Sequence, residues 1–87
     1  MKLDGKIAVV TGGAMGNGLG IVNVFLKYGA KVAILDKDTK ITDTVKELRE
    51  NGYDVKGCQV DIREEEKVKS AIDKIAEYYG KIDILVN

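Results

Sequence analysis

Three glycines near the N-terminus have the spacing of a phosphate-binding turn. They are Gly12, Gly16 and Gly18, and they lie in the segment Thr11–Gly20, directly after a short apolar run. A phosphate needs backbone N–H groups that no Cβ shields, and the first turn of a helix supplies such donors together with a favourable dipole. The segment therefore predicts a turn that binds the phosphates of a nucleotide, rather than an ordinary glycine-rich connection.

Two short phosphate-binding patterns do not fit this segment. The dinucleotide fingerprint G-x-G-x-x-G would place its third glycine at position 21, which is Ile21. The P-loop of triphosphate-binding proteins would need a lysine where the chain has Leu19. Triphosphate chemistry is therefore not expected.

Two aspartates follow apolar segments and could contact the rest of a nucleotide. Asp36 comes eighteen residues after Gly18, where a carboxylate can accept hydrogen bonds from both hydroxyls of an adenosine ribose and would repel a 2′-phosphate. Asp61 also follows an apolar residue and could bind an adenine amino group. Each has a structural alternative, because an aspartate can cap the helix that follows it, and Asp38 and Thr39 compete with Asp36 for that role.

Strands and helices that could position these residues alternate along the chain. Runs of β-branched and aliphatic residues are typical of strands buried on both faces, and apolar residues at helical spacing mark the segments between them. Strands are predicted at residues 6–11, 31–36, 53–60 and 82–86, and helices from 16 to just before 29, from 41 to near 52, and from 64 to just before 80.

This alternation predicts a parallel sheet with right-handed crossovers, because each connection is long enough to hold a helix. We expect an α/β fold, a Rossmann-type doubly wound parallel sheet of the form βαβαβαβ, with strand order 3-2-1-4. The first two helices should cover one face and the third helix the other. The cofactor crevice would then lie between the first and fourth strands.

The composition is that of one ordinary globular domain. The 87 residues are 45% apolar and 32% charged, and 14 Lys and Arg balance 14 Asp and Glu. A formal charge of zero offers no basic surface to nucleic acid or anionic lipid, so neither is expected as a partner. The single Cys58, expected to be a buried small hydrophobe, and the lack of an apolar N-terminal signal segment favour the cytoplasm.

Several segments resemble the N-terminal part of the classical short-chain dehydrogenases/reductases. They are Thr11-Gly12-x-x-x-Gly16-x-Gly18, Gly29-Ala30-x-Val32, Asp61-Ile62 and Gly80-Lys81-Ile82-Asp83-Ile84-Leu85-Val86-Asn87. The resemblance runs through the whole chain. It implies that residues 1–87 are an NAD(P)-binding Rossmann half-domain, cut off after Asn87.

The resemblance implies cofactor-binding roles for nine residues: Gly12, Met15, Gly16, Asn17, Gly18, Asp36, Asp61, Ile62 and Asn87. Asn87 would be the first residue of the family's N-N-A-G motif. Asn17 replaces the isoleucine that usually lies near the nicotinamide half. Met15 stands where NADP-preferring members often carry Arg or Ser, which agrees with Asp36 in favouring NAD over NADP.

The resemblance also implies what the full-length protein does. It would be an oxidoreductase that transfers hydride between a nicotinamide cofactor and an alcohol or ketone, and it would form a homo-oligomer. The family's catalytic serine and Tyr-x-x-x-Lys pair are not in these residues, because none of the four tyrosines has a lysine four positions on. We therefore assign no catalytic residue and expect no turnover by the 87 residues alone.

Two other functions remain open at this point. The chain could be a dinucleotide-binding module without catalysis, acting as a sensor or as a piece that complements another chain. An S-adenosylmethionine methyltransferase domain also has acidic residues after its second and third strands. Such a domain usually begins its glycine-rich loop with an acidic residue, and this chain has Thr11 there.

The last expectation concerns the edge of the predicted sheet. The strand at 82–86 would be an open edge, and Ile84-Leu85-Val86 has no protective charge beyond Asp83. The third helix alone would cover one face and leave the strand at 6–11 partly bare there. We therefore expect the 87 residues to be a fragment that needs further strands, or a second copy, at this edge.

Overall fold

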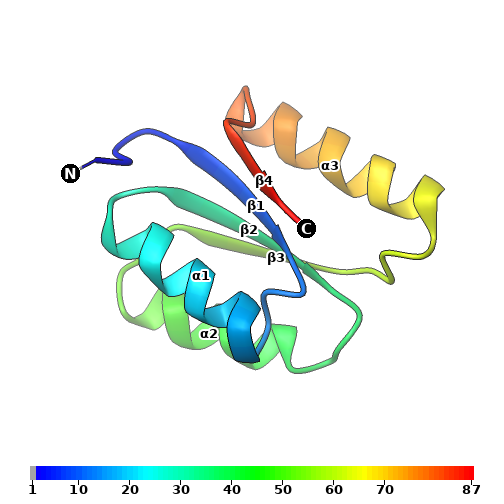
Figure 1. The fold of residues 1–87 in the computed structure, drawn as a ribbon, viewed down its shortest axis with the longest axis horizontal. Coiled ribbons are helices and arrows are strands. Elements are labelled where there is room, and N and C mark those ends of the chain that lie inside the picture. The colour runs from blue at the N-terminus through cyan, green and yellow to red at the C-terminus, as the bar shows by residue number, and fades with distance from the viewer. Residues whose placement is uncertain (1) are drawn as a thin grey trace.

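Strands and helices alternate along the chain in the computed structural model, which describes residues 2–87 (Figure 1). In order they are β1 (Ile7–Thr11), α1 (Gly16–Lys27), β2 (Lys31–Asp36), α2 (Ile41–Glu50), β3 (Val55–Gln59), α3 (Glu65–Tyr79) and β4 (Ile84–Val86). This is the predicted βαβαβαβ order. Gly29 and Gly80 follow α1 and α3 with φ values of +98° and +85°, a conformation that glycine adopts readily and that ends helices.

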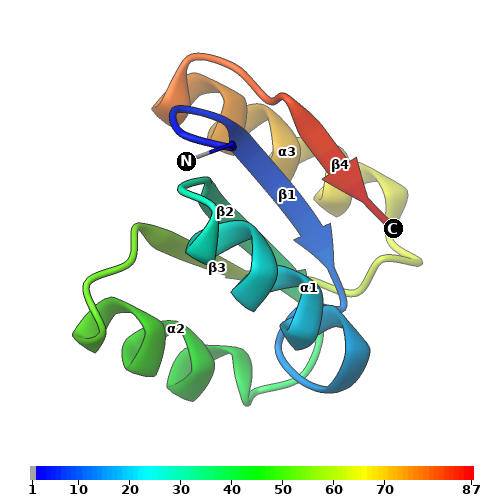
Figure 2. The ribbon, with the colours of Figure 1, turned by 60° about the vertical axis from the view of Figure 1, so that its left-hand side comes forward.

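The four strands form one parallel sheet in the predicted order β3-β2-β1-β4 (Figure 2). At its centre Val9 of β1 lies opposite Ala33 of β2 on one side and Leu85 of β4 on the other. Because the strands are parallel, the loops that follow β1, β2 and β3 leave the sheet at the same end (Figure 1). The predicted phosphate-binding turn and both aspartates belong to this end.

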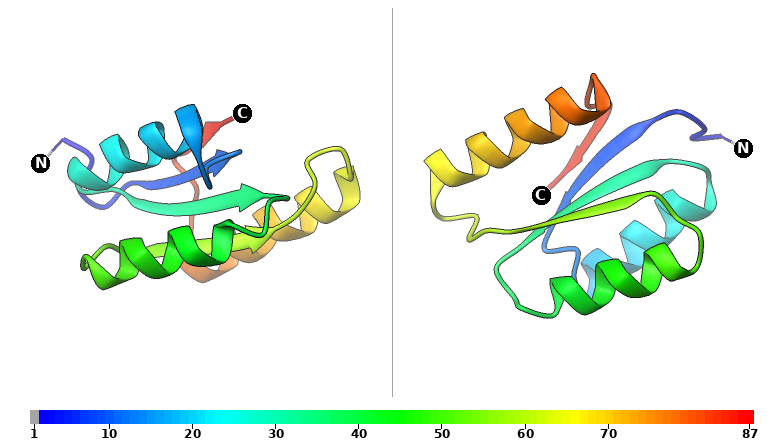
Figure 3. Two further views of the ribbon diagram at one scale, coloured as in Figure 1. Left: turned by 90° about the horizontal axis from the view of Figure 1, so that it is seen from below. Right: turned by 180° about the vertical axis from the view of Figure 1, so that it is seen from behind.

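The helices cover the two faces of the sheet as predicted (Figure 3, right). On one face, Val10 and Ile34 belong to a buried cluster with Val22 of α1 and Val45 of α2. On the other face a second cluster packs beneath α3, formed by Val9, Ala33, Leu35, Val60, Ala71 and Ile75. The sheet therefore has a hydrophobic core on each side.

The prediction that β1 would be partly bare beneath α3 is wrong. Val9, which faces α3, is 0% exposed, and Ile7 is 3% exposed. The reason is the reach of α3: its 15 residues place Ile75 against this face, and Ile82 packs against the same cluster. Apolar exposure remains at the outer strand β4, where Leu85 is 50% exposed.

Three strands are shorter than the sequence predicts. At the start of β1, the N–H of Ile7 donates to the Asp83 carboxylate at 2.8 Å, whereas the N–H of Asp83 donates to the Ile7 carbonyl. A side chain thus takes a position in the ladder, and regular pairing with β4 begins only at Ala8 and Ile84. β3 loses its first two predicted residues and its last, and Cys58 is only partly buried because β3 is the outer strand.

We expect Asp83→Asn to lower the free energy of unfolding at neutral pH. The Ile7 N–H and the Lys81 ammonium, 3.1 Å away, hold the pKa of Asp83 below its ordinary value. The carboxylate therefore contributes stability that is fully present above the unfolded pKa, about 3.9, and that is lost as the pH falls through the lower folded value. Urea unfolding of both proteins at several pH values measures this.

Asp73→Asn is the matched control, because Asp73 is an exposed residue of α3 outside these contacts. It should leave stability nearly unchanged. The gap between the wild type and Asp83→Asn should close on acidification. A difference in the free energy of unfolding that stays constant from neutral pH down to about pH 2 would contradict the assignment. It would mean that the negative charge of Asp83 contributes nothing to stability, because that charge is lost on acidification.

Candidate nucleotide-binding site

The turn after β1 brings its glycines into contact with one another. The N–H of Gly12 donates to the Leu35 carbonyl at 2.7 Å, which continues the pairing with β2 beyond the end of β1. The chain then reverses, and Gly18 in the first turn of α1 lies against Gly12. A Cβ on Gly18 would overlap the Gly12 carbonyl oxygen and come within 3.0 Å of the Gly13 Cα. Glycine is therefore required at position 18 by close backbone packing.

The first turn of α1 has no side-chain cap. The residue before the helix is Met15, which has extended backbone angles and no acceptor that could bind the first N–H groups. No acidic residue lies in that turn either. Met15, Gly16 and Asn17 are exposed, so the positive end of the helix dipole faces an open surface that can accept an anion.

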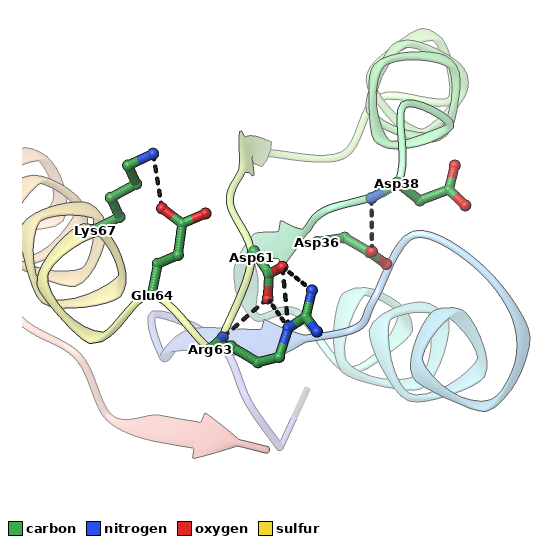
Figure 4. Close-up of polar contacts among 6 residues, drawn as sticks. All are labelled: Asp36, Asp38, Asp61, Arg63, Glu64 and Lys67. Atoms are coloured by element: carbon green, nitrogen blue, oxygen red, sulfur yellow. Dashed lines mark hydrogen bonds and ion pairs between the residues drawn. The ribbon is translucent and has the colours of Figure 1, made fainter.

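Asp36 lies beside this turn at the end of β2. Its carboxylate accepts the N–H of Ala14 at 3.1 Å. It also accepts the N–H of Asp38 at 3.0 Å (Figure 4). It does not cap α2, whose preceding residue is Lys40 and which has no side-chain cap. The Asp38 carboxylate accepts the Lys40 N–H at 2.8 Å instead. Asp36 is thus oriented toward the glycine-rich turn, with carboxylate lone pairs left for other donors.

Thr44 of α2 contributes a contact that the sequence analysis missed. Its hydroxyl donates to the Ala14 carbonyl at 2.8 Å, so Ala14 is held through its N–H by Asp36 and through its carbonyl by Thr44. A signal was present in the sequence: Thr44 comes three residues after Ile41 and one before Val45, on the buried side of the helix. A polar residue there needs a partner.

Asp61, after β3, is held by Arg63 rather than by α3. The guanidinium binds both carboxylate oxygens, with Nη2 2.6 Å from Oδ2 and Nε 3.0 Å from Oδ1. The backbone N–H of Arg63 adds a further bond to Oδ1 (Figure 4). These bonds, the guanidinium first, hold the pKa of Asp61 well below its ordinary value. The residue before α3 is Glu64, which has no side-chain cap, so neither predicted capping alternative is realised.

A cavity of about 350 Å³ joins four of the predicted residues at this end of the sheet. Its lining comprises Gly12, Asp36, Lys37, Val60, Asp61, Ile62 and Arg63. The N–H of Val60 donates to the Asp36 carbonyl at 3.0 Å, which fixes the two aspartate-bearing segments side by side. Ile62 is 58% exposed at its border. The cavity has the size of an ordinary ligand pocket, about 300–1,000 Å³.

Asn87 stands apart from this cavity, beyond the end of β4. The Thr11 hydroxyl donates to the Val86 carbonyl at 3.2 Å, and Val86 pairs with Val10. These contacts place the end of β4 next to the end of β1. Asn87 is exposed there, on the other side of β1 from Asp36.

Residues 2–87 contain neither a candidate metal site nor a membrane-spanning helix. No group of three or more cysteine and acidic side chains in this range has an arrangement that could hold a metal ion. No helix within the same range has the length and apolar character needed to cross a membrane.

Comparison with known proteins agrees with this geometry. The model of a family described as short chain dehydrogenase matches residues 6–87. The chain belongs to this family. It is 42% identical over 86 residues to an uncharacterized oxidoreductase of Thermotoga maritima, covering 98% of this chain and 34% of that protein.

Two plant relatives have named activities. A zerumbone synthase of Zingiber zerumbet is 42% identical, with 100% of this chain and 33% of that protein covered. A (+)-borneol dehydrogenase of Salvia officinalis is 38% identical, with 100% and 31% covered. Relatives of this chain thus include enzymes that act on alcohol or ketone substrates. The chain spans about one third of the length of these relatives.

Two solved structures show which cofactors homologues bind. A short chain dehydrogenase of Burkholderia cenocepacia in complex with NADP has a TM-score of 0.92 and 35% identity, with 100% of this chain and 36% of that one covered. A short chain dehydrogenase/reductase of Burkholderia phymatum in complex with NAD has a TM-score of 0.91 and 31% identity, with 98% and 31% covered. Homologues therefore bind NAD or NADP.

We expect Gly18→Ala to destabilise the short-chain dehydrogenase chain by about 1–3 kcal/mol, the usual effect of forcing extra atoms into a packed region. The added methyl group must push the turn at Gly12 away from α1. Gly20→Ala is the matched control, because nothing lies within 4 Å of a Cβ at that position of the same helix. It should be neutral or stabilise by up to about 1 kcal/mol. Urea unfolding of the two variants measures the difference, and equal stabilities would contradict the close packing.

We expect Arg63→Ala to raise the pKa of Asp61 part of the way to its ordinary value. The guanidinium hydrogen bonds would be lost, while the N–H of residue 63 and the charge of Lys37 would remain. Carboxyl-carbon NMR titration measures the change. Lys67→Ala is the control, because Lys67 pairs with Glu64 at 2.7 Å in the same region and not with Asp61. If Arg63→Ala leaves the titration of Asp61 unchanged, the hydrogen bonds between the Arg63 guanidinium and Asp61 do not persist in solution.

Proposed function

We propose that these residues form the NAD-binding part of an oxidoreductase that transfers hydride between a nicotinamide cofactor and an alcohol or ketone. The observation that carries the proposal is the position of the Asp36 carboxylate, held against the glycine-rich turn by the N–H of Ala14. A carboxylate at the end of the second strand of such a sheet binds the adenosine ribose of a dinucleotide. The family membership supports the same reaction class.

The pyrophosphate would lie on the turn from Gly12 to Gly18. The uncapped first turn of α1 offers its N–H groups and its dipole there. The close contact of Gly18 with Gly12 leaves no side chain between the helix and the ligand. Exposed Met15, Gly16 and Asn17 would contact the pyrophosphate and the ribose next to it.

The adenine would occupy the cavity between Asp36 and Asp61. Ile62 offers an exposed apolar side chain to one side of a flat base. Asp61 would accept a hydrogen bond from the adenine amino group. To do so, at least one of its carboxylate oxygens must release the Arg63 guanidinium and bind the base instead. Arg63 is mostly exposed, with 77% of its side chain accessible, so it can swing away without leaving a buried charge.

The nicotinamide half would extend toward the ends of β1 and β4. The bond from Thr11 to the Val86 carbonyl holds these ends together, and Asn87 follows at the rim of this crevice. Hydride transfer and substrate binding would depend on groups outside these residues. For the whole protein we propose a homo-oligomer in the cytoplasm, the compartment that the single cysteine of these 87 residues favours.

The preference for NAD over NADP rests on a balance of charges. Asp36 would repel a 2′-phosphate, whereas Lys37 and Arg63 line the same cavity and would attract one. Asp61 lines the cavity as well, and its negative charge offsets that of Arg63 there. The Asp36 carboxylate is nearest to the ribose in the proposed arrangement, and we therefore favour NAD.

We expect Asp36→Asn to weaken NAD binding by about 10–100-fold, the equivalent of losing hydrogen bonds to a charged group worth about 1.5–3 kcal/mol. The variant should bind NADP no worse than the wild type, because an amide does not repel phosphate. Calorimetric titration of both cofactors with the 87 residues, and with any longer polypeptide that contains them, measures both affinities.

Asp38→Asn is the matched control, since it removes the same charge two residues away on a carboxylate that binds the Lys40 N–H. It should leave the ratio of NAD to NADP affinity nearly unchanged. Wild-type protein that binds NADP more tightly than NAD would contradict the role given to Asp36. Binding of neither cofactor by the longer polypeptide would contradict the proposed function as a whole.

A further inference from the structure

A second cavity lies on the α3 face of the sheet, outside the proposed nucleotide site. It has a volume of about 300 Å³, is open on one side, and is lined by residues of β2, β3 and α3. It shares no lining residue with the cavity between Asp36 and Asp61. Figure 3 (right) shows α3 on this side of the strands, opposite α1 and α2. The nucleotide proposed above accounts for none of its residues.

The inner lining of this cavity is apolar. Ala33 of β2 and Ile75 of α3 are 1% and 7% exposed, and Ala71 beside them is 6% exposed. Two of the three are alanines, so the space between sheet and helix is left open by the small size of the side chains. Cys58 of β3 lies at the partly exposed side of the cavity. Such a surface favours the apolar part of a ligand.

Two lysines border the cavity, and no acidic residue lines it. Lys56 comes from β3 and Lys74 from the exposed side of α3. In the described range, residues 2–87, the structure records no ion pair for either ammonium group. Two positive charges without a carboxylate between them attract an anion.

Two tyrosines at the end of α3 hold the Lys56 side chain in place at the cavity. The Lys56 ammonium lies over the Tyr78 ring at 3.8 Å from its centroid, and the Tyr79 ring meets Tyr78 edge-on at 4.8 Å. The Tyr79 hydroxyl donates to the Asp54 carboxylate at 2.8 Å, and burial together with this bond raises the pKa of Tyr79, which keeps the donor proton in place. Tyr78 is 64% exposed, yet these contacts hold it at the cavity mouth.

We propose that this cavity binds a small amphipathic carboxylate, with its aryl or acyl body against Ala33 and Ile75 and its carboxylate between the ammonium groups of Lys56 and Lys74. The volume is at the lower end of the range for ligand pockets, about 300–1,000 Å³, so the ligand is small. The lysines supply charge-assisted hydrogen bonds, and the ring of Tyr78 adds an aromatic surface for the body. This binding does not depend on the nucleotide.

The test uses Cys58, the only cysteine of the chain, as a reporter at the cavity. The probe is 4-phenylbutyrate, and 4-phenylbutan-1-ol is its uncharged analogue. Alkylation of Cys58 by iodoacetamide is followed by mass spectrometry at increasing probe concentration. We expect saturating phenylbutyrate to slow alkylation at least several-fold. The alcohol should need at least a tenfold higher concentration to give the same protection.

Lys74→Glu should abolish the protection, because it places a carboxylate where the ligand's carboxylate would bind. Lys69→Glu is the matched control, because this substitution makes the same charge change at an exposed position of α3 outside the cavity. This variant should keep the protection. Should Lys74→Glu lose its helical circular dichroism signal, the neutral Lys74→Gln replaces it and is expected to weaken protection about tenfold.

Three results would overturn the proposal. They are no protection by phenylbutyrate, equal protection by the alcohol, and protection that survives both substitutions of Lys74. In the absence of probe, an alkylation rate that falls as the protein concentration is raised would also contradict the proposal, because a second copy of the chain would then cover the cavity. Calorimetric titration with NAD runs in parallel, so that loss of nucleotide binding and loss of carboxylate binding are separate outcomes.

Discussion

The structure depends on the burial of β1 between two strands and two helical layers. Its residues Ala8, Val9 and Val10 are all 0% exposed, a pattern that requires neighbours on both edges and helices on both faces. Parallel neighbours in turn require long crossovers, which α1, α2 and α3 supply. The position of every loop at the carboxyl end of the sheet follows from this one strand.

At that end of the sheet, hydrogen bonds from both backbone and side-chain groups connect the loops. Ala14 is held by Asp36 and Thr44, from two different elements, and the Val60 N–H is held by the Asp36 carbonyl. These bonds join the turn after β1 to the segments after β2 and β3. The glycine-rich turn is thereby positioned before any ligand binds, which reduces the ordering that binding must otherwise supply.

The same chain uses its charged side chains in two different ways. At the nucleotide end, Asp61 and Arg63 neutralise each other, and they can exchange partners because the Arg63 side chain is largely accessible. On the α3 face, Lys56 and Lys74 have no carboxylate partner among the described residues and border an apolar space. The first arrangement suits a ligand that brings hydrogen-bond donors, and the second suits a ligand that brings a negative charge.

Much of this organisation could be predicted from the sequence, because it depends on patterns that are local or periodic. The apolar runs indicated the strands, the helical spacing indicated the helices, and the long connections indicated the parallel order 3-2-1-4. Gly18 was recognised from spacing, and its contact with Gly12 supplies the reason.

Other features needed the tertiary structure. The clamp of Arg63 on Asp61, the bond from Thr44 to Ala14 and the Asp83 carboxylate at the start of β1 depend on side-chain directions that spacing does not reveal. The full burial of β1 beneath α3 and the cavity at Cys58 likewise depend on where one helix crosses the sheet, and the packing of side chains far apart in sequence decides that.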